Sequence, residues 1–311
     1  MGGTDLKFQR IACVDNVNLT AEAYRSLEAM AETPFAPCDS DPSDARETCA
    51  RIADADCALV SWRTRVDGEI LNKCQSLRYI GLCASKYTNP NAGNVDIKAA
   101  TSRGITVTAV GQYGDEATAE FIFCTLLNLC RGFGKVQWRD MPCELHGKTL
   151  GIIGMGAMGT HVLRLALGFG MQVVYFSRTR KQECESLGAK YLSKKDVLRL
   201  SDVVSLHVPK GINCLSADDF ADLSDGSVLV NTCLGIVFAT EDFETWISKQ
   251  SNFAIMDESA DVAYRKFRDL ANVIYPAVIA GRTAESRARL SAQVLSNMDA
   301  FLAGHPQNVI N

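Results

Sequence analysis

The sequence has no run that approaches the roughly 18 consecutive apolar residues of a membrane-spanning helix, so no membrane association is expected. It also has no excess of basic residues, because its formal net charge is −4. A chain with this mildly acidic balance is not attracted to nucleic acid or to anionic membranes. Its first residues contain no apolar segment of the kind found in secretory signals, which favours a cytoplasmic protein.

Closely spaced cysteines are also missing, although the chain has 12 cysteines. No two of them have the C-x-x-C spacing of a zinc or redox site. Several stand in apolar runs, as Cys124 does, and a thiol in such a run packs as a small hydrophobic group. Free thiols are therefore favoured over disulfides, as expected in a reducing cytosol. Only four histidines are present, and no pair has the spacing of metal ligands, so no metal site is expected.

What the sequence does contain is an alternation of short apolar runs with helix-compatible stretches, over 311 residues that suffice for two domains. This alternation predicts parallel α/β sheets. Long helices are expected from Asp115 to about Arg131 and over residues 285–302. The expected strands are residues 11–14, 57–62 and 77–82 in a first series, and 150–153, 172–176, 203–208, 227–231, 253–256 and 273–275 in a second.

The glycine-rich segment after the strand 150–153 is the strongest functional signal. It precedes a helix expected over residues 161–170, which is the context of a dinucleotide site. Gly154 would permit a tight turn, Gly156 would let the backbone approach a pyrophosphate, and Gly159 would allow close packing of helix on strand. The helix N-terminus would present free N–H groups to the phosphates. The predicted contacts are Gly154, Gly156, Ala157, Met158 and Gly159, and a structural glycine-rich turn is the alternative.

The segment after the second strand of this series indicates which dinucleotide binds. An NAD site usually has Asp or Glu near the position of Ser177, to hold the ribose hydroxyls. A carboxylate would repel a 2′-phosphate, whereas a hydroxyl and guanidinium groups bind one. We therefore expect NADP(H), with Ser177, Arg178, Thr179 and Arg180 as contacts. An ordinary basic surface loop beside an NAD site is the alternative.

These patterns predict an α/β protein with two Rossmann-like or flavodoxin-like domains and parallel sheets. The second β-α series forms the NADP-binding domain, residues 117–285. Because the last helix is long enough to return to the first domain, the substrate domain takes residues 1–116 and 286–311. The nucleotide-binding domain would then be inserted into the N-terminal domain.

The order of these segments resembles the D-isomer-specific 2-hydroxyacid dehydrogenases from about residue 55 to residue 290. Residues 147–154 are very similar to the start of that family's nucleotide domain, and residues 230–235 resemble its N-x-x-R-G motif. Residues 177–180 look like its NADPH-using glyoxylate and hydroxypyruvate reductases. The resemblance implies an oxidoreductase with a small-molecule substrate and further cofactor contacts at His207, Val208, Pro209, Cys233, Leu234 and Asp257. For His207, a structural hydrogen bond at the strand end is the alternative.

All three members of that family's catalytic triad are missing at the matching positions. Leu234 replaces the arginine of N-x-x-R-G, residues 275–281 contain no histidine, and residues 257–262 lack the expected glutamate. Without a cation for the carboxylate and a proton for the alkoxide, reduction of an ordinary 2-keto acid is not expected. The stretch between Arg131 and Gly147 is also shorter than usual in the family, where it contributes to a homodimer, so a homodimer stays open.

Two explanations fit a site without the triad. In the first, the acid has moved to Lys86 or Tyr113, which the resemblance places near the nicotinamide, although both residues are also typical of solvated loops. The substrate would then be a small carbonyl, hydroxyl or imine compound other than a simple 2-keto acid. In the second, the chain binds NADP(H) without turnover, as a sensor or a partner-binding protein. A conventional 2-hydroxyacid dehydrogenase would require a different alignment of the arginine and histidine segments.

Overall fold

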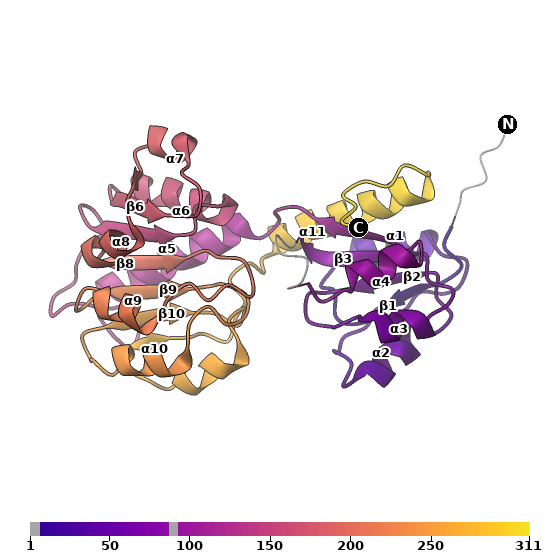
Figure 1. Ribbon diagram of the computed structural model, residues 1–311, viewed down its shortest axis with the longest axis horizontal. Coiled ribbons are helices and arrows are strands. Elements are labelled where there is room, and N and C mark those ends of the chain that lie inside the picture. Colours follow the sequence, from indigo (N-terminus) through magenta and orange to yellow (C-terminus); the bar gives the residue numbers. More distant parts are fainter. Residues whose placement is uncertain (1–6, 87–92) are drawn as a thin grey trace. The chain divides into compact units, whose positions relative to one another are not determined.

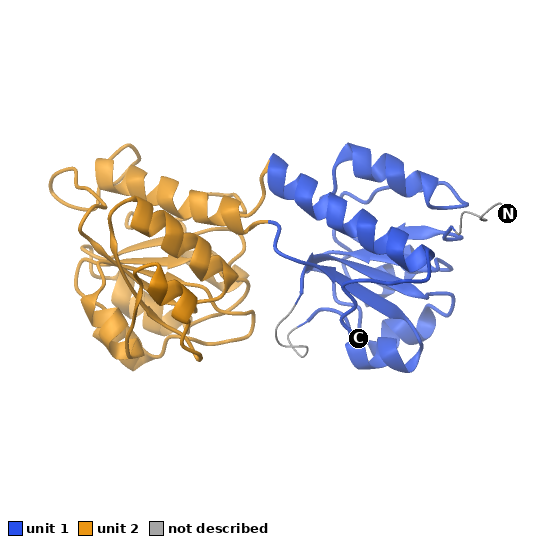
Figure 2. Ribbon diagram, turned by 90° about the horizontal axis from the view of Figure 1, so that it is seen from above, with its two compact units in different colours: residues 1–113, 284–311 blue, residues 114–283 orange. Residues whose placement is uncertain are grey.

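The computed structural model describes residues 7–86 and 93–311. The chain forms two compact units, which Figure 2 distinguishes by colour. The first contains Met1–Tyr113 and Ala284–Asn311, and the second contains Gly114–Thr283. The second unit is therefore inserted between the two chain segments that build the first. The sequence predicts these boundaries after residue 116 and before residue 286, close to the observed ones.

The first unit is built on a four-stranded parallel sheet with the strand order β1-β2-β3-β4. Its strands are buried over almost their whole length, which explains why they read as continuous apolar runs. Leu290, Val294 and Met298 of the last helix pack into the core of this unit. The strands are β1 (Ile11–Cys13), β2 (Cys57–Val60), β3 (Tyr79–Ser85) and β4 (Thr106–Val110), and the helices are α1 (Ala21–Ala29), α2 (Ala45–Ile52), α3 (Gly68–Lys73), α4 (Ile97–Ser102) and α11 (Ala284–Leu302).

The second unit is built on a seven-stranded parallel sheet with the order β11-β10-β9-β8-β5-β6-β7. The chain runs from β5 to β7 toward one edge and then returns to β8 on the other side of β5. The strand order thus reverses between β5 and β8, and open α/β sheets bind ligands at the carboxyl ends of the strands beside such a switch point. The strands are β5 (Thr149–Ile153), β6 (Gln172–Phe176), β7 (Lys190–Tyr191), β8 (Val203–Leu206), β9 (Val228–Asn231), β10 (Phe253–Met256) and β11 (Val273–Ile274).

Helices cover both faces of this sheet (Figure 1). The apolar sides of α5 (Asp115–Arg131) and α6 (Ala157–Gly168) pack into one core cluster. The opposite face packs against α8, α9 and α10 in a second cluster. The predicted α/β fold class with parallel sheets is confirmed. The remaining elements are α7 (Gln182–Ser186), α8 (Lys194–Leu200), α9 (Ala217–Asp222), α10 (Thr240–Ile247) and a 3₁₀ helix (Val262–Phe267).

The differences from the sequence prediction include the start of α6 and the strand β7. Helix α6 begins at Ala157 rather than at residue 161, because Gly156, still in an extended conformation, serves as its N-cap. The two-residue strand β7 was not predicted, since two residues carry no detectable period. Among the described residues, no helix combines the length and the apolar character needed to cross a bilayer.

The segment between α5 and β5 is held by a buried tryptophan. Helix α5 ends at Arg131, and its C-cap residue Gly132 has a left-handed φ of +66°. The indole Nε1 of Trp138 then donates a 2.8 Å hydrogen bond to the carbonyl oxygen of Gly226. The Trp138 side chain also belongs to the α5–α6 core cluster, so this short segment is fixed to the second unit.

Candidate nucleotide-binding site

Gly154 makes a turn that only glycine can make at this position. Its φ is +100°, a conformation that other residues rarely adopt. A Cβ atom here would lie 2.2 Å from the carbonyl oxygen of His207, which follows β8. The Gly154 N–H also donates a 2.8 Å hydrogen bond to the carbonyl of Phe176 at the end of β6. The turn therefore touches the ends of both strands that flank β5.

Gly159 and Gly156 have different surroundings. A Cβ atom on Gly159 would lie 2.5 Å from the Gly154 oxygen, so its absence lets α6 pack on the turn. A Cβ atom on Gly156 would meet no heavy atom of the described residues within 4 Å. The fold itself therefore does not require glycine at position 156. Open space at this position is what the close approach of a pyrophosphate demands.

The N-terminus of α6 can receive a negatively charged group. Gly156 supplies no capping side chain, and the first turn contains no acidic residue. The first N–H groups of a helix have no intrahelical partner, and they carry the positive end of the helix dipole. Ala157 and Met158, both half-buried, occupy this first turn. Together with the open side of Gly156, these features fit the pyrophosphate of a dinucleotide.

The loop after β6 holds the four residues predicted to select NADP(H). Ser177 is half-buried, and its hydroxyl donates a 2.5 Å hydrogen bond to the carbonyl of Thr179. Arg178 is exposed and forms no ion pair within the described part of the chain. Arg180 is also exposed, but its guanidinium pairs with Glu185. The two arginines are therefore not equivalent as phosphate ligands.

His207 extends the sheet beyond β8 and is electrically neutral near pH 7. Its backbone N–H donates a 2.8 Å hydrogen bond to the carbonyl oxygen of Ile153. Its ring Nε2 lies 2.8 Å from the hydroxyl of the buried Ser205. Burial lowers the pKa of His207 to about 4. The ring is thus a hydrogen-bonded group without charge, which favours the structural alternative for this residue. Val208 and Pro209 follow it as half-buried residues.

Cys233 links the ends of β8 and β9. Its thiol donates to the carbonyl of Leu206 over 3.1 Å, and its N–H donates to Oδ1 of Asn231 over 3.1 Å. Burial raises the pKa of Cys233 to about 12, so the thiol stays protonated. The amide nitrogen of Asn231 is buried without a partner in the described part of the chain. Leu234, the next residue after Cys233, is half-buried and contributes an apolar side chain.

Asp257 is fully buried at the end of β10. One carboxylate oxygen accepts hydrogen bonds from the hydroxyl of Ser259 at 2.9 Å and from the N–H of Ala280 at 2.7 Å. The other accepts from the N–H of Ser259 at 3.2 Å. Burial raises the pKa of Asp257, and these hydrogen bonds oppose the rise. The carboxylate of Asp257 fixes the segment that ends at Ala280. The cofactor contact predicted for Asp257 from the sequence would require this carboxylate to become exposed.

Lys86 and Tyr113, the predicted catalytic residues, both belong to the first unit. Lys86 directly follows β3; its side chain is exposed, and its N–H donates a 3.1 Å hydrogen bond to Val110. Tyr113 is half-buried against the core of that unit, and its carbonyl accepts a 2.9 Å hydrogen bond from Nε of Arg289. The two residues therefore follow the carboxyl ends of β3 and β4, respectively.

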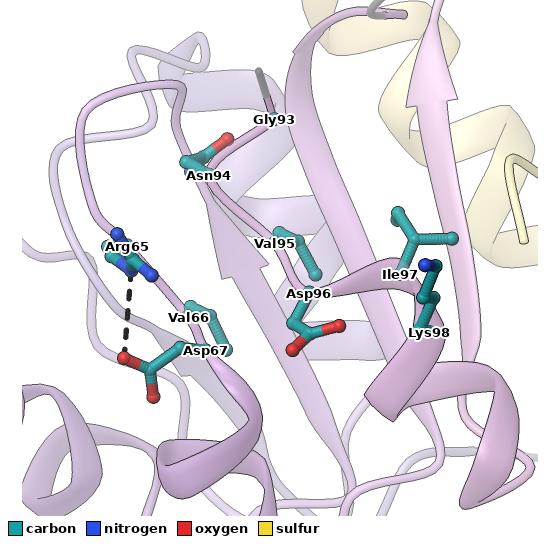
Figure 3. Close-up of a pocket in the computed structure, with 9 residues that line it drawn as sticks. All are labelled: Arg65, Val66, Asp67, Gly93, Asn94, Val95, Asp96, Ile97 and Lys98. Atoms are coloured by element: carbon teal, nitrogen blue, oxygen red, sulfur yellow. Dashed lines mark ion pairs between the residues drawn. The ribbon is translucent and has the colours of Figure 1, made fainter. Parts of the chain in front are cut away.

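A separate pocket of the first unit, shown in Figure 3, contains no residue predicted to be functional. Its carboxylates serve the fold, because Asp67 and Asp96 accept hydrogen bonds from the first N–H groups of α3 and α4. Asp67 also pairs with Arg65 over 3.6 Å. Within residues 7–86 and 93–311, no group of three histidine, cysteine, aspartate or glutamate side chains could hold a metal ion. The pocket is lined by Arg65, Val66, Asp67, Gly93, Asn94, Val95, Asp96, Ile97 and Lys98.

Comparison with known proteins identifies relatives along almost the whole chain. Residues 128–276 match the family described as "D-isomer specific 2-hydroxyacid dehydrogenase, NAD binding domain". The glyoxylate reductase of Korarchaeum cryptofilum is 31% identical over 298 residues, which are 88% of each chain. The hydroxypyruvate reductase of Blautia hydrogenotrophica is 26% identical over 313 residues, 93% of this chain and 94% of that one.

Solved structures share the fold at lower sequence identity. An acyclic imino acid reductase in complex with NADPH and D-Arg superposes with a TM-score of 0.80 at 22% identity, over 97% of this chain and 99% of that one. The D-lactate dehydrogenase of Escherichia coli gives a TM-score of 0.79 at 20% identity, with the same coverage of 97% and 99%. These matches cover both units.

Proposed function

The chain belongs to the family of D-isomer-specific 2-hydroxyacid dehydrogenases and is an oxidoreductase that uses a nicotinamide cofactor, and from this premise we propose a more specific reaction. The cofactor is NADP(H), and the substrate is a small molecule with a carbonyl or imine group that is not a simple 2-keto acid. Of the two groups, we favour the imine. The observation that carries the proposal is the loop after β6, where Ser177 takes the position of the carboxylate of an NAD site and the exposed Arg178 follows it.

The cofactor half of the proposal rests on two strand ends of the second unit, those of β5 and β6. Gly156 and the first turn of α6 would hold the pyrophosphate, and Ser177 and Arg178 would hold a ribose 2′-phosphate. A guanidinium group binds phosphate through charge-assisted hydrogen bonds that a ribose hydroxyl does not replace. When bound, NADPH supplies the hydride of the reaction.

The substrate half rests on missing positive charge. By resemblance, the family binds the substrate carboxylate with the arginine that Leu234 replaces here. No imidazolium replaces it from the end of β8, because His207 is neutral at pH 7. Reduction of a ketone produces an alkoxide that needs a proton donor, whereas a protonated imine becomes a neutral amine on receiving a hydride. A site without the usual acid is therefore better suited to an imine.

Lys86 and Tyr113 are the side chains that we propose for the remaining polar contacts with the substrate. The resemblance places the loop after β3 at the substrate carboxylate, and there the exposed ammonium of Lys86 would supply the missing cation or a proton. Tyr113 is the second candidate donor. A solved structure of the same fold is named an acyclic imino acid reductase, which makes imino acids a reasonable first class of substrates to test.

The test is NADPH oxidation with glyoxylate, hydroxypyruvate and other 2-keto acids, each alone and mixed with an amine that forms an imine, beside calorimetric binding of NADPH and NADH. We expect turnover of the mixtures and little with the keto acids alone. Fast turnover of a keto acid alone would refute the substrate assignment. Binding without turnover on any compound would identify a silent NADP(H)-binding protein instead.

The same assay tests the proposed role of Lys86. Lys86→Ala should abolish turnover while NADPH affinity stays within about twofold, because all proposed cofactor contacts lie in the other unit. Lys98→Ala, which removes another exposed lysine of the first unit, is the matched control and should leave both quantities unchanged. Full turnover by Lys86→Ala would remove this residue from the site.

A further inference from the structure

The loop after β6 contains two arginines, but only one is free to bind an anion. In Arg180, Nε lies 2.7 Å from Oε1 of Glu185 and Nη2 lies 2.6 Å from Oε2. This is a bidentate pair, the strongest arrangement that guanidinium and carboxylate groups form. Arg178 has no such pairing within the described residues. The carboxylate thus engages one of the two groups that the sequence assigned to the 2′-phosphate.

Glu185 is held in place from the core of the sheet. The hydroxyl of the fully buried Tyr175 donates a 2.9 Å hydrogen bond to Oε1 of Glu185. The same hydroxyl accepts a 2.7 Å hydrogen bond from the N–H of Lys181, which fixes its direction. The guanidinium of Arg180 also lies over the ring of Tyr191, 5.9 Å from its centroid. Arg180 is therefore constrained by several groups at once.

The charge of Glu185 opposes a phosphate at this loop. The hydrogen bond from Arg180 lowers the pKa of Glu185, so the carboxylate is ionised at neutral pH. Its negative charge lies next to the loop and offsets one of the two guanidinium charges. A phosphate dianion that approaches Arg180 must overcome this repulsion, whereas the uncharged ribose hydroxyls of NADH do not.

We propose that Glu185 is a specificity-determining residue that competes with the 2′-phosphate of NADP(H) for Arg180. Arg178 then carries most of the phosphate recognition, and Glu185 limits the preference for NADP(H) over NAD(H). The inference deepens the proposed use of NADP(H) and rests on the same site. Glu185 acts through Arg180 and touches no reacting atom, so it is a positioning residue.

The experiment measures dissociation constants of NADPH and NADH by calorimetry for the full-length chain without substrate. Glu185→Gln keeps an acceptor for Tyr175 but removes the charge, and it should tighten NADPH binding about fivefold while NADH affinity changes less than about twofold. Glu185→Ala should affect each of the two affinities in the same direction as Glu185→Gln does. Glu183→Gln is the matched control, because it removes the same charge from an exposed position of the same helix. It should leave both affinities unchanged.

The double variant Glu185→Gln/Arg180→Ala separates this mechanism from a general charge effect, because it should lose the gain in NADPH affinity. An unchanged or weaker NADPH affinity of Glu185→Gln would overturn the inference, since the carboxylate would then be inert or would orient Arg180 toward the phosphate. If the wild-type chain preferred NADH but Glu185→Gln still gained NADPH affinity through Arg180, the proposed use of NADP(H) would be refuted and the inference about Glu185 would stand. Absence of binding of either dinucleotide would overturn both.

Discussion

Alanine substitutions at Gly154 and Gly156 should separate the folding role of the glycine-rich turn from its binding role. At Gly156, φ is −93° and no heavy atom of the described residues lies within 4 Å of a new Cβ atom. Alanine is a poorer N-cap than glycine by about 0.5–1 kcal/mol, but it also lowers the entropy of the unfolded chain by about 0.4–1 kcal/mol. We therefore expect the free energy of unfolding to change by less than about 0.5 kcal/mol.

The same methyl group should interfere with the dinucleotide. It would occupy the space that the pyrophosphate needs, so Gly156→Ala should weaken binding of NADPH and of NADH at least about tenfold, or about 1.4 kcal/mol. Both cofactors should be affected equally, because both contain the pyrophosphate. Calorimetric titration measures the affinities, and thermal unfolding without cofactor measures stability.

Gly154→Ala should behave in the opposite way. Its φ of +100° disfavours alanine, and the Cβ atom would lie 2.2 Å from the His207 oxygen, so the backbone must move. We expect a loss of about 2–4 kcal/mol in the free energy of unfolding and a melting temperature lower by about 5–10 °C. Wild-type dinucleotide affinity in a stable Gly156→Ala variant would refute the phosphate assignment, because the open space would then have no ligand.

Three further predictions concern single side chains. Arg178→Ala should weaken NADPH binding about tenfold and leave NADH binding unchanged, as calorimetry can measure; equal losses for both would contradict a phosphate contact. Because the pKa of His207 falls from 6.5 unfolded to about 4 folded, the unfolded chain binds more protons between these values. Stability should therefore fall by up to ~3 kcal/mol as pH drops from 6.5 to 4, and His207→Gln should reduce this slope in urea unfolding. Trp138→Phe, which leaves the Gly226 carbonyl without its 2.8 Å donor, should cost about 1–3 kcal/mol in the same assay, and an unchanged midpoint would show that water replaces the donor.

The strands and the glycine turn were predictable because their causes are local. A strand buried on both faces is mostly apolar, and β5, β8 and β10 show this in their composition, with Thr149 and Ser205 as the polar exceptions. Gly154 was predictable because the tight turn needs a backbone conformation, with φ of +100°, that residues other than glycine rarely adopt. The start of α6 was missed because Ala157, Met158 and Gly159 do not resemble a conventional first helical turn.

Partners that meet only in the folded chain were beyond the sequence. Arg178 and Arg180 cannot be distinguished from the sequence alone, and only the folded structure shows that Arg180 is paired with Glu185. The carboxylate five positions after Arg180 was the available signal, but many such pairs remain solvated. Likewise, nothing local to Asp257 reveals that Ala280 donates to it, because that contact forms when the segment after β11 returns to the end of β10.

The electrostatics of the strand ends distinguish the two substrate classes more sharply than the missing triad alone. A 2-keto acid is an anion that gains charge on its oxygen during reduction, so it needs positive groups. A protonated imine loses its positive charge during reduction, and a positive group at the reacting atom would destabilise it before the reaction. The apolar Leu234 and the neutral His207 lack such charge, which suits the imine. Turnover should therefore follow the protonation of the imine substrate: its rate should fall above the pKa of the substrate, and it should shift with that pKa when the amine is changed. A pH profile independent of the amine would instead indicate a proton donor on the protein.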